Sequence, residues 1–395
     1  MLDRFLHDGI EWGSLTVERP GGQTRHFGSG QPEADISIHD PRVERRVLSD
    51  PDFMLGQTYM EEGWSTTDLR ALLAVLMGNF DDPEPGSARR LAQAAIRPLQ
   101  QWNRRAASRR NVAHHYDLDE SLFRRFLDTD MQYSCAYWPD GVEDLENAQA
   151  AKRALIRRKL CLEPGQQVLD IGCGWGGLAI ELAEQADARV IGLTLSEEQA
   201  RVARDRVRER GLEDRVDIRI QDYRDVPERF DRIVSVGMFE HVGASYYDTY
   251  FRALHDHLTP DGVVLLHTIG RLGRPGVTNA WIRRYIFPGG YIPSMSEVSA
   301  AIERQHLATT DLEVLRLHYA YTLAAWFERF QAVRGEVAAE KGERFCRMWE
   351  FYLAASEMAF HYRGLVVFHF QLAADQTAVP LSRDYLHEAA GAAAC

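Results

Sequence analysis

Short apolar runs alternate with longer charged stretches through the middle of the chain. Five runs have the length and composition of buried strands: 167–170, 189–194, 216–220, 230–236 and 262–269. The stretches 178–185, 196–210 and 245–258 have helical spacing. We expect the second of these helices to begin with a capping box, in which Ser196 and Gln199 bond each other's backbone, and to end at Gly211. This alternation predicts an α/β fold with a mostly parallel sheet and helices on both faces.

The first 85 residues do not follow this rhythm and predict a small α+β domain. Ser65 or Thr66, with Asp68 close behind, is expected to start a helix over the apolar run 69–77. The Pro- and Gly-containing segment 81–86 then breaks it. We assign 1–85 to this domain, 86–112 to a basic linker and 113–395 to the larger α/β domain.

Residues 86–116 contain seven arginines and no acidic residue. The arginines are Arg89, Arg90, Arg97, Arg104, Arg105, Arg109 and Arg110. Such a segment can attract lipid headgroups. It can equally be a solvated linker that docks on an acidic domain, and the residues favour neither alternative.

Composition narrows the possible functions. The 395 residues are 45% hydrophobic and 26% charged, which is typical of a folded protein with about two domains. A net charge of -12 argues against nucleic-acid binding by the whole surface. Neither a secretory signal nor a membrane-spanning run is recognised. Five scattered cysteines without a CxxC pair predict a cytoplasmic protein without disulfides or a metal site.

A glycine-rich turn follows the first strand of the α/β region. Gly172, Gly174 and Gly177 satisfy the dinucleotide-binding pattern, which alone is a weak signal. Asp170 precedes the first glycine by two residues, where a carboxylate suits the cationic end of S-adenosylmethionine (SAM) and would repel a pyrophosphate. No acid closes the second strand at Thr194, which counts against a nicotinamide cofactor and also against the commonest methyltransferase pattern.

Three polar or aromatic residues further along suit a nucleoside. Gln199 can bond ribose hydroxyls, Asp222 can accept from an adenine amino group, and Tyr223 can pack on the ring. The alternatives are that Gln199 only caps its helix, and that residues 221–225 form an ordinary polar loop.

Several segments together resemble the cyclopropane fatty acid synthase family, which includes the mycolic acid cyclopropane synthases. The resemblance covers roughly residues 111–372. Its segments are His115-Tyr-Asp-Leu, Tyr133-Ser-Cys-Ala-Tyr-Trp, Asp170-Ile-Gly-Cys-Gly-Trp-Gly, Gly192-Leu-Thr-Leu-Ser-Glu-Glu-Gln, Gln221-Asp-Tyr-Arg-Asp, Phe239-Glu-His-Val-Gly, His267-Thr-Ile-Gly, Tyr285-Ile-Phe-Pro-Gly-Gly-Tyr and Tyr319-Ala-Tyr-Thr-Leu. Tyr59-Met-Glu-Glu-Gly-Trp looks like the extra amino-terminal domain of the phospholipid-acting members.

The resemblance implies a class I SAM-methyltransferase (Rossmann-like) fold with a seven-stranded sheet, and a catalytic domain over 113–395. It implies transfer of the SAM methyl to a cis double bond of a phospholipid acyl chain, proton loss to a bound bicarbonate, and ring closure. The bicarbonate cage would be Cys135, Glu240, His267, Ile269 and Tyr319. The SAM site would be Tyr133, Ser134, Asp170, Gly172, Gly174, Gly176, Thr194, Leu195, Gln199, Asp222 and Tyr223.

Other interpretations compete with this one. Taken singly, Cys135 and His267 would be ordinary buried residues, but residues that gather at strand ends favour a site. The main alternative function is acyl-chain methylation without ring closure, since the motifs are shared. An oxidoreductase lacks its expected acid, and a non-catalytic lipid carrier would be expected to lose Glu240, His267 or the glycine turn. The resemblance also implies a homodimer that associates peripherally with the inner face of the membrane.

Overall fold

The computed structural model describes residues 2–80 and 120–387, which form two compact units. The sheet unit comprises 120–276, 289–318 and 366–387 of these residues. The N-terminal unit comprises 2–80, 277–288 and 319–365. The region expected to follow the linker therefore contributes two segments to the N-terminal unit. The linker expected at 86–112 lies outside the described residues.

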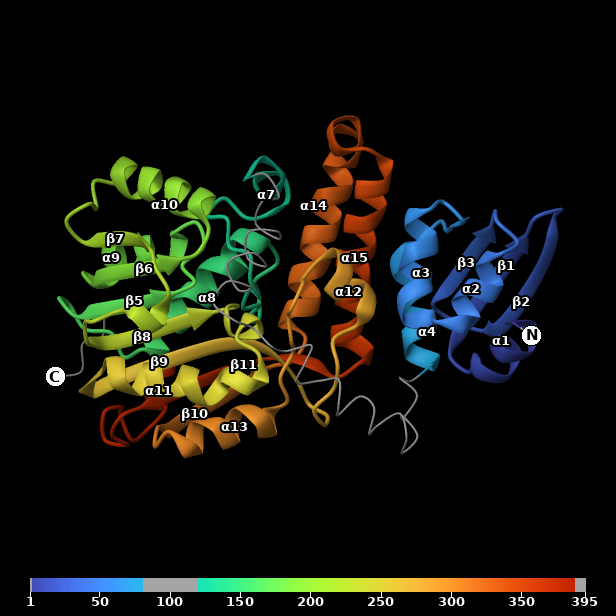
Figure 1. Cartoon of the computed structure of the whole chain (residues 1–395). Coiled ribbons are helices and arrows are strands. Elements are labelled where there is room, and N and C mark those ends of the chain that lie inside the picture. Colours follow the sequence, from blue (N-terminus) through green and yellow to red (C-terminus); the bar gives the residue numbers. More distant parts are fainter. Residues whose placement is uncertain (1, 81–119, 388–395) are drawn as a thin grey trace. The chain divides into compact units, whose positions relative to one another are not determined.

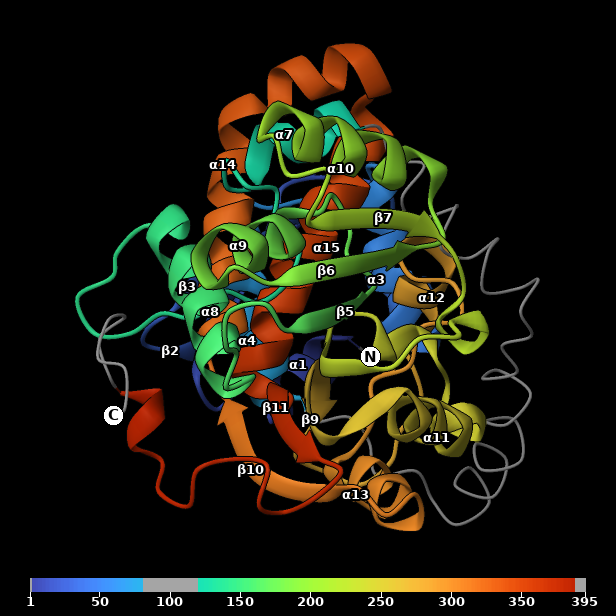
Figure 2. The same ribbon diagram turned by 90° about the vertical axis from the view of Figure 1, so that its left-hand side faces the viewer.

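The sheet unit is built on seven strands in the order β10-β11-β9-β8-β5-β6-β7 (Figure 2). Their bounds are β5 Gln167–Ile171, β6 Arg189–Thr194, β7 Val216–Ile220, β8 Phe230–Val236, β9 Leu258–Arg271, β10 Ala308–Leu315 and β11 Leu365–Ala373. The run from β9 to β7 is parallel, whereas β10 pairs with β11 in antiparallel fashion. The predicted α/β fold and its seven-stranded sheet are confirmed, and β9 is longer than expected.

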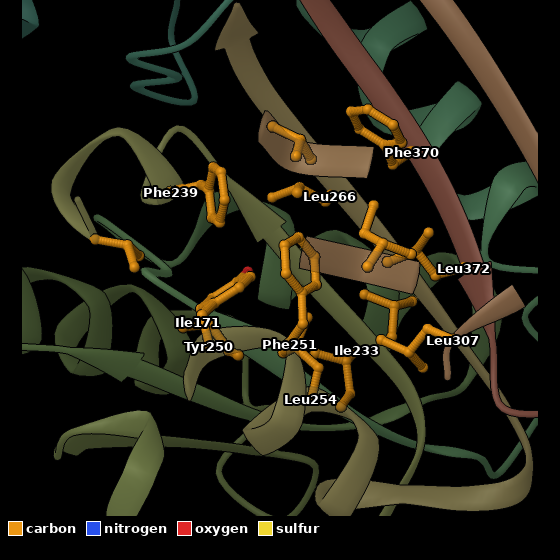
Figure 3. Packing of buried hydrophobic residues seen from close by; sticks show 14 of the residues in the cluster. Ile171, Ile233, Phe239, Tyr250, Phe251, Leu254, Leu266, Leu307, Phe370 and Leu372 are labelled. Atoms are coloured by element: carbon orange, nitrogen blue, oxygen red, sulfur yellow. The ribbon is translucent and has the colours of Figure 1, made fainter. Parts of the chain in front are cut away.

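Helices cover both faces of this sheet because alternate strand residues point to opposite sides. Val168 packs with α8 Leu145–Lys159, α9 Gly177–Ala186 and α10 Glu197–Glu209. Leu169 packs on the other face with α11 Tyr247–His257 and α13 Met295–Arg304. Figure 3 shows other residues of this cluster, among them Phe251 and Leu254 of α11. The remaining helices of this unit are short: α7 Glu120–Phe126, η1 Tyr223–Asp225, η2 Phe239–His241, η3 Ala244–Tyr246 and η4 Asp384–Leu386. The helix expected over 245–258 thus starts as the 3-10 turn η3 and continues as α11.

Only one of the two hydrogen bonds of the expected capping box of α10 is present. The Ser196 hydroxyl accepts from the Gln199 backbone N–H at 3.2 Å, as predicted. The Gln199 side chain does not return to the Ser196 backbone, because its Oε1 accepts from the Thr194 hydroxyl at 2.8 Å. That half of the prediction is wrong, since Gln199 is turned toward the end of β6.

The N-terminal unit contains a four-stranded sheet in the order β2-β1-β3-β4 (Figure 1). The strands are β1 Gly13–Arg19, β2 Gln23–Ser29, β3 Glu33–Ile38 and β4 Trp64–Ser65. Its helices are α1 Leu2–Gly9, α2 Val43–Ser49, α3 Pro51–Met60, α4 Leu69–Asn79, α12 Ala280–Tyr285, α14 His318–Lys341 and α15 Glu343–Tyr362. Both α3 and α4 pack against α15, so segments far apart in sequence share one core.

The start of α4 differs from the expectation. Asp68 is its N-cap, and its carboxylate accepts from the Ala71 N–H at 2.9 Å. Ser65 instead belongs to β4 and pairs with Ser37 of β3. The predicted start at Ser65 or Thr66 is therefore wrong by a few residues, because strand pairing takes Ser65.

Buried ion pairs and hydrogen bonds tie the early helices to the late ones. The Tyr59 hydroxyl of α3 donates to Glu350 of α15 at 2.7 Å, and Arg334 Nε of α14 bonds the same carboxylate at 2.7 Å. Arg70 of α4 pairs with Glu357 of α15, whose side chain is only 3% exposed. These bonds specify how the segments join, since a buried charge without its partner is costly. Within the described ranges, we find no helix that combines the length and the apolar character needed to span a bilayer.

Candidate active site

The glycine-rich turn connects β5 to α9 and lies at the carboxyl end of β5. Gly172, Gly174 and Gly176 have φ of 86°, 55° and 80°, a region that favours glycine. A Cβ on Gly172 would lie 2.9 Å from Met238 Cβ. A Cβ on Gly176 would lie 3.0 Å from Cβ of Ala203 in α10. Gly172 therefore allows a close backbone approach to η2, while Gly176 allows α9 to pack on α10.

Two cavities meet at this turn, and both are lined by Gly172, Gly174 and Gln199. The first, the β6–β8 cavity, is also lined by Ile171, Leu193, Thr194, Leu195, Gln221, Asp222, Tyr223, Arg224, Gly237, Met238, His241, Val242 and Tyr246. The second, the Asp170 cavity, is also lined by Met131, Gln132, Tyr133, Ser134, Asp170, Cys173, Trp175, Gly177, Leu178 and Val236. Every residue predicted to bind SAM lines one of them except Gly176.

The β6–β8 cavity offers groups suited to a nucleoside. The Asp222 carboxylate is held by Arg224, whose Nε lies 2.8 Å from Oδ1, so its orientation is set before any ligand arrives. The Arg224 guanidinium also lies 5.5 Å from the centre of the Tyr223 ring. His241, which was not among the predicted ligand-binding residues, lines the same cavity. Burial lowers the pKa of His241 to about 4, so its ring is neutral.

The Asp170 cavity holds a carboxylate prepared for a cation. Asp170 is 2% exposed, and its Oδ2 has no hydrogen-bond partner among the described residues. Burial raises the pKa of this carboxyl to about 7, against the opposing influence of the Lys152 ammonium. An ammonium group from a ligand would satisfy Oδ2 and offset the cost of burying it. The residues present therefore fit the amino-acid end of SAM.

Two side chains of α8 fasten the segment that lines this cavity, and neither was predicted from the sequence. Lys152 is fully buried and donates from Nζ to Gln132 Oε1 at 2.6 Å and to Ser134 Oγ at 2.9 Å. Gln149 Nε2 donates to the backbone carbonyl of Ser134 at 3.0 Å. Their signal in the sequence is a polar residue at positions where the spacing from Leu145 predicts a buried apolar stripe.

A buried acid lies just beyond β8. Glu240 is in η2, and its Oε1 accepts from the backbone N–H of Ile269 on β9 at 2.7 Å. Its Oε2 has no hydrogen-bond partner in the part of the chain described. Burial raises the pKa of Glu240 to about 7, against the lowering effect of the Ile269 bond. The acid can therefore gain or lose a proton near neutral pH.

The other predicted cage residues are distributed over both units. His267 of β9 is 1% exposed and lies in the sheet unit with Cys135, Glu240 and Ile269. Cys135 is 0% exposed and directly follows Ser134, whose hydroxyl accepts from Lys152 Nζ of α8 at 2.9 Å. Burial, and after it the same ammonium, lowers the pKa of His267. Tyr319 belongs to the N-terminal unit, where its ring packs on Phe360 and Trp326 with centroids 4.9 and 5.8 Å apart.

The fold and the cavities at the carboxyl ends of β5 and β6 define a class I SAM-dependent methyltransferase. A family model described as "Mycolic acid cyclopropane synthetase" matches residues 103–370, and the chain belongs to this family. The resemblance seen in the motifs is thereby confirmed.

Individual relatives agree with this membership. The chain is 43% identical over 341 residues to "Cyclopropane-fatty-acyl-phospholipid synthase" of Escherichia coli (strain K12), over 85% of this chain and 87% of the relative. It is 39% identical over 363 residues to "Tuberculostearic acid methyltransferase UfaA1" of Mycobacterium tuberculosis, over 87% of this chain and 84% of the relative. The crystal structure of mycolic acid cyclopropane synthase CmaA1 complexed with SAH and CTAB matches with a TM-score of 0.63 and 35% identity. That match covers 67% of this chain and 97% of CmaA1.

Proposed function

We propose that this protein is a cyclopropane-fatty-acyl-phospholipid synthase that transfers the SAM methyl to the cis double bond of an unsaturated acyl chain. The observation that carries the proposal is the pair of cavities that share Gly172, Gly174 and Gln199 at the glycine turn. One of them is also lined by His241 of η2, the turn that carries the buried acid Glu240. The choice of acyl chain rests on the relative from Escherichia coli, which is similar over most of both chains. The expected enzyme class and activity are borne out by these relatives.

The residues of the chain bind and orient the methyl donor. Asp170 accepts from the ammonium group, and the backbone at Gly172 and Gly174 lets the ligand approach closely. Asp222 and Tyr223 receive the adenine, and Gln199, which lines both cavities, lies where the ribose would connect them. SAM supplies an electrophilic methyl group. An alkene is a weak nucleophile, so holding the two reacting carbons together must lower much of the barrier.

A bound bicarbonate is the second part of the proposal, held by Glu240, His267, Ile269, Cys135 and Tyr319. When bound, it would supply the base for the proton lost from the new methyl group. The unpartnered Oε2 of Glu240 supports an additional ligand at this place. The Ile269 N–H is already bonded to Glu240, so an anion there must share or replace that bond. Addition of a methyl group to the alkene leaves a carbocation on the acyl chain. Water would trap this carbocation, so few polar groups other than the cage should face it.

Methylation without ring closure is the second candidate product. It is favoured by the similarity to UfaA1, named a tuberculostearic acid methyltransferase, which extends over as much of this chain as the similarity to the Escherichia coli enzyme. Either product needs the same methyl donor and the same alkene. They differ in where the final proton is lost, so only the product decides between them.

A product assay tests the proposal. The protein is incubated with SAM and vesicles of cis-monounsaturated phospholipid, and the acyl chains are analysed by mass spectrometry and proton NMR. Chains heavier by one methylene unit with upfield ring protons are expected. The same mass gain with vinyl protons would favour an unsaturated methylated product, and a saturated branch would need a reductant as well. If SAM binds but no chain gains mass, the acyl acceptor is wrong while the methyltransferase class stands.

Membrane association and assembly complete the proposal. We place the enzyme in the cytoplasm, peripherally on the inner face of the membrane, as a homodimer. The basic linker would attract anionic headgroups, and replacing Arg104, Arg105, Arg109 and Arg110 with Gln should weaken vesicle binding, most visibly at low salt. Unchanged vesicle binding would exclude the linker as the contact. Sedimentation equilibrium tests the dimer separately.

A further inference from the structure

Two histidines on neighbouring strands form a buried pair inside the sheet unit. His267 of β9 and His369 of β11 are 1% and 0% exposed. His267 Nδ1 lies 2.7 Å from His369 Nε2, which is a hydrogen bond between two ring nitrogens. One proton must lie between them, because two N–H groups or two lone pairs facing each other at this distance would repel. The protonation of one ring therefore dictates that of the other.

Both rings are neutral. Burial lowers the pKa of each well below the usual value for histidine, and the ammonium groups of Lys152 and Lys159 lower both further. His318 adds to this effect on His369. Two neutral rings carry one N–H each, so only two arrangements of the pair are possible.

The surroundings of the second nitrogen of His369 separate these arrangements. Its Nδ1 is buried and has no hydrogen-bond partner in the described parts of the chain. If His267 were the donor, the proton of His369 would be on that nitrogen as a buried N–H without an acceptor, a rare and costly arrangement. His369 is therefore the donor, from Nε2–H to His267 Nδ1.

We propose that His369 is a positioning residue that holds His267 in the Nε2–H tautomer. In that tautomer His267 presents an N–H donor on the side of its ring away from His369. This deepens the proposed function, and rests on it, because an N–H donor is what a bound anion such as bicarbonate requires from this ring. His369 acts through His267 and need not touch the substrate.

The test compares two replacements that differ in one property. His369→Gln keeps an N–H donor near the position of Nε2, whereas His369→Leu keeps bulk and removes the donor. His255→Gln, at an exposed histidine of α11, is the matched control. The tautomer of His267 is measured by 15N NMR of histidine-labelled protein, with the signal assigned by its loss in His267→Asn. Turnover and the KM for SAM are measured on the same preparations.

We expect Nε2–H at His267 in the parent and in His369→Gln, and mixed tautomers in His369→Leu. We expect kcat to fall by roughly 10-fold or more in His369→Leu with KM for SAM unchanged, and to recover in His369→Gln. An Nδ1–H tautomer in the parent would overturn the inference, even if His369→Leu did not fold. Equal kcat in parent and His369→Leu would also overturn it. If the tautomer is as expected but His267→Asn turns over normally, the anion-site role of His267 fails instead.

Discussion

Replacing Glu240 with Gln separates the charge of this residue from its shape. The glutamine keeps the Oε1 acceptor that bonds the Ile269 N–H at 2.7 Å, so η2 and β9 stay joined. It removes the ionisable group, whose pKa burial raises from 4.5 to about 7. The folded parent thus holds this proton more tightly than the unfolded chain does. The variant tests whether this tighter proton binding contributes to the stability of the folded protein.

The direction in which the free energy of unfolding changes with pH follows from this difference in pKa between the folded and unfolded chain. The contribution of the Glu240 proton to stability is complete below the unfolded value of 4.5 and is lost as pH rises through about 7. The difference corresponds to about 3 kcal/mol, most of which is lost between about pH 5 and about pH 8. The introduced glutamine is uncharged throughout, so the free energy of unfolding should fall less with pH in Glu240→Gln than in the parent.

Urea denaturation followed by tryptophan fluorescence over this pH range measures the effect. The contributions of other titrating groups such as Asp170 cancel when the pH profile of the variant is subtracted from that of the parent. Glu303→Gln, at an exposed residue of α13, is the control. Parallel pH profiles for parent and Glu240→Gln would refute the buried-acid argument. In the product assay the variant should keep SAM binding and lose most turnover. Turnover equal to that of the parent would contradict the bicarbonate assignment.

Three further replacements test the surroundings of the site and the N-terminal unit. Lys152→Met removes the ammonium that fastens the wall of the Asp170 cavity and should weaken SAM binding by about 10-fold in calorimetry, in line with a lost buried hydrogen bond; an unchanged Kd would show that Lys152 has no such role. Gly176 has φ of 80°, and an added Cβ would lie 3.0 Å from Ala203 Cβ. Gly176→Ala should therefore lower the free energy of unfolding by about 1–3 kcal/mol. Equal stability of Gly176→Ala and the parent would mean that α9 and α10 can move apart at little energetic cost. Glu357→Leu leaves Arg70 without its buried partner and should cost about 2–3 kcal/mol, less than a fully buried pair because Arg70 still reaches solvent. A smaller loss in urea denaturation would show that Glu328, 3.5 Å from the Arg70 guanidinium, compensates for the lost partner.

Five of the seven strands were predictable because they are short apolar runs whose pattern is local. Strands β10 and β11 were not assigned from this pattern, and the expectation of seven strands came from the family resemblance. Helix α8 was missed since Gln149, Lys152 and Lys159 interrupt its buried stripe, and a polar residue there looks like the end of an apolar face. The candidate site residues were proposed from their local motifs, and their roles stay predictions. The bond between Glu240 and the Ile269 N–H was not predicted, because no local pattern reports contacts between separate strands.

The sequence did not indicate that residues 277–288 and 319–365 belong to the N-terminal unit, for a similar reason. Nothing near Tyr59 in the sequence indicates that its hydroxyl bonds Glu350, which lies on α15. His369 likewise lies in an apolar strand and becomes informative only when β11 is placed beside β9. Tertiary contacts of this kind decide which helices share a core, and they override the simple order of the chain.

The interleaving of segments has a consequence for synthesis of the protein. Ribosomes release the amino-terminal sheet and α4 long before α15, against which α4 packs. Strand β11, which completes the other sheet between β10 and β9, follows α15 directly. Both cores are therefore closed by the same late stretch of the nascent chain, and a chain that stops before α14 leaves apolar surface open in both units. Such chains need protection from aggregation until their last helices and final strand emerge.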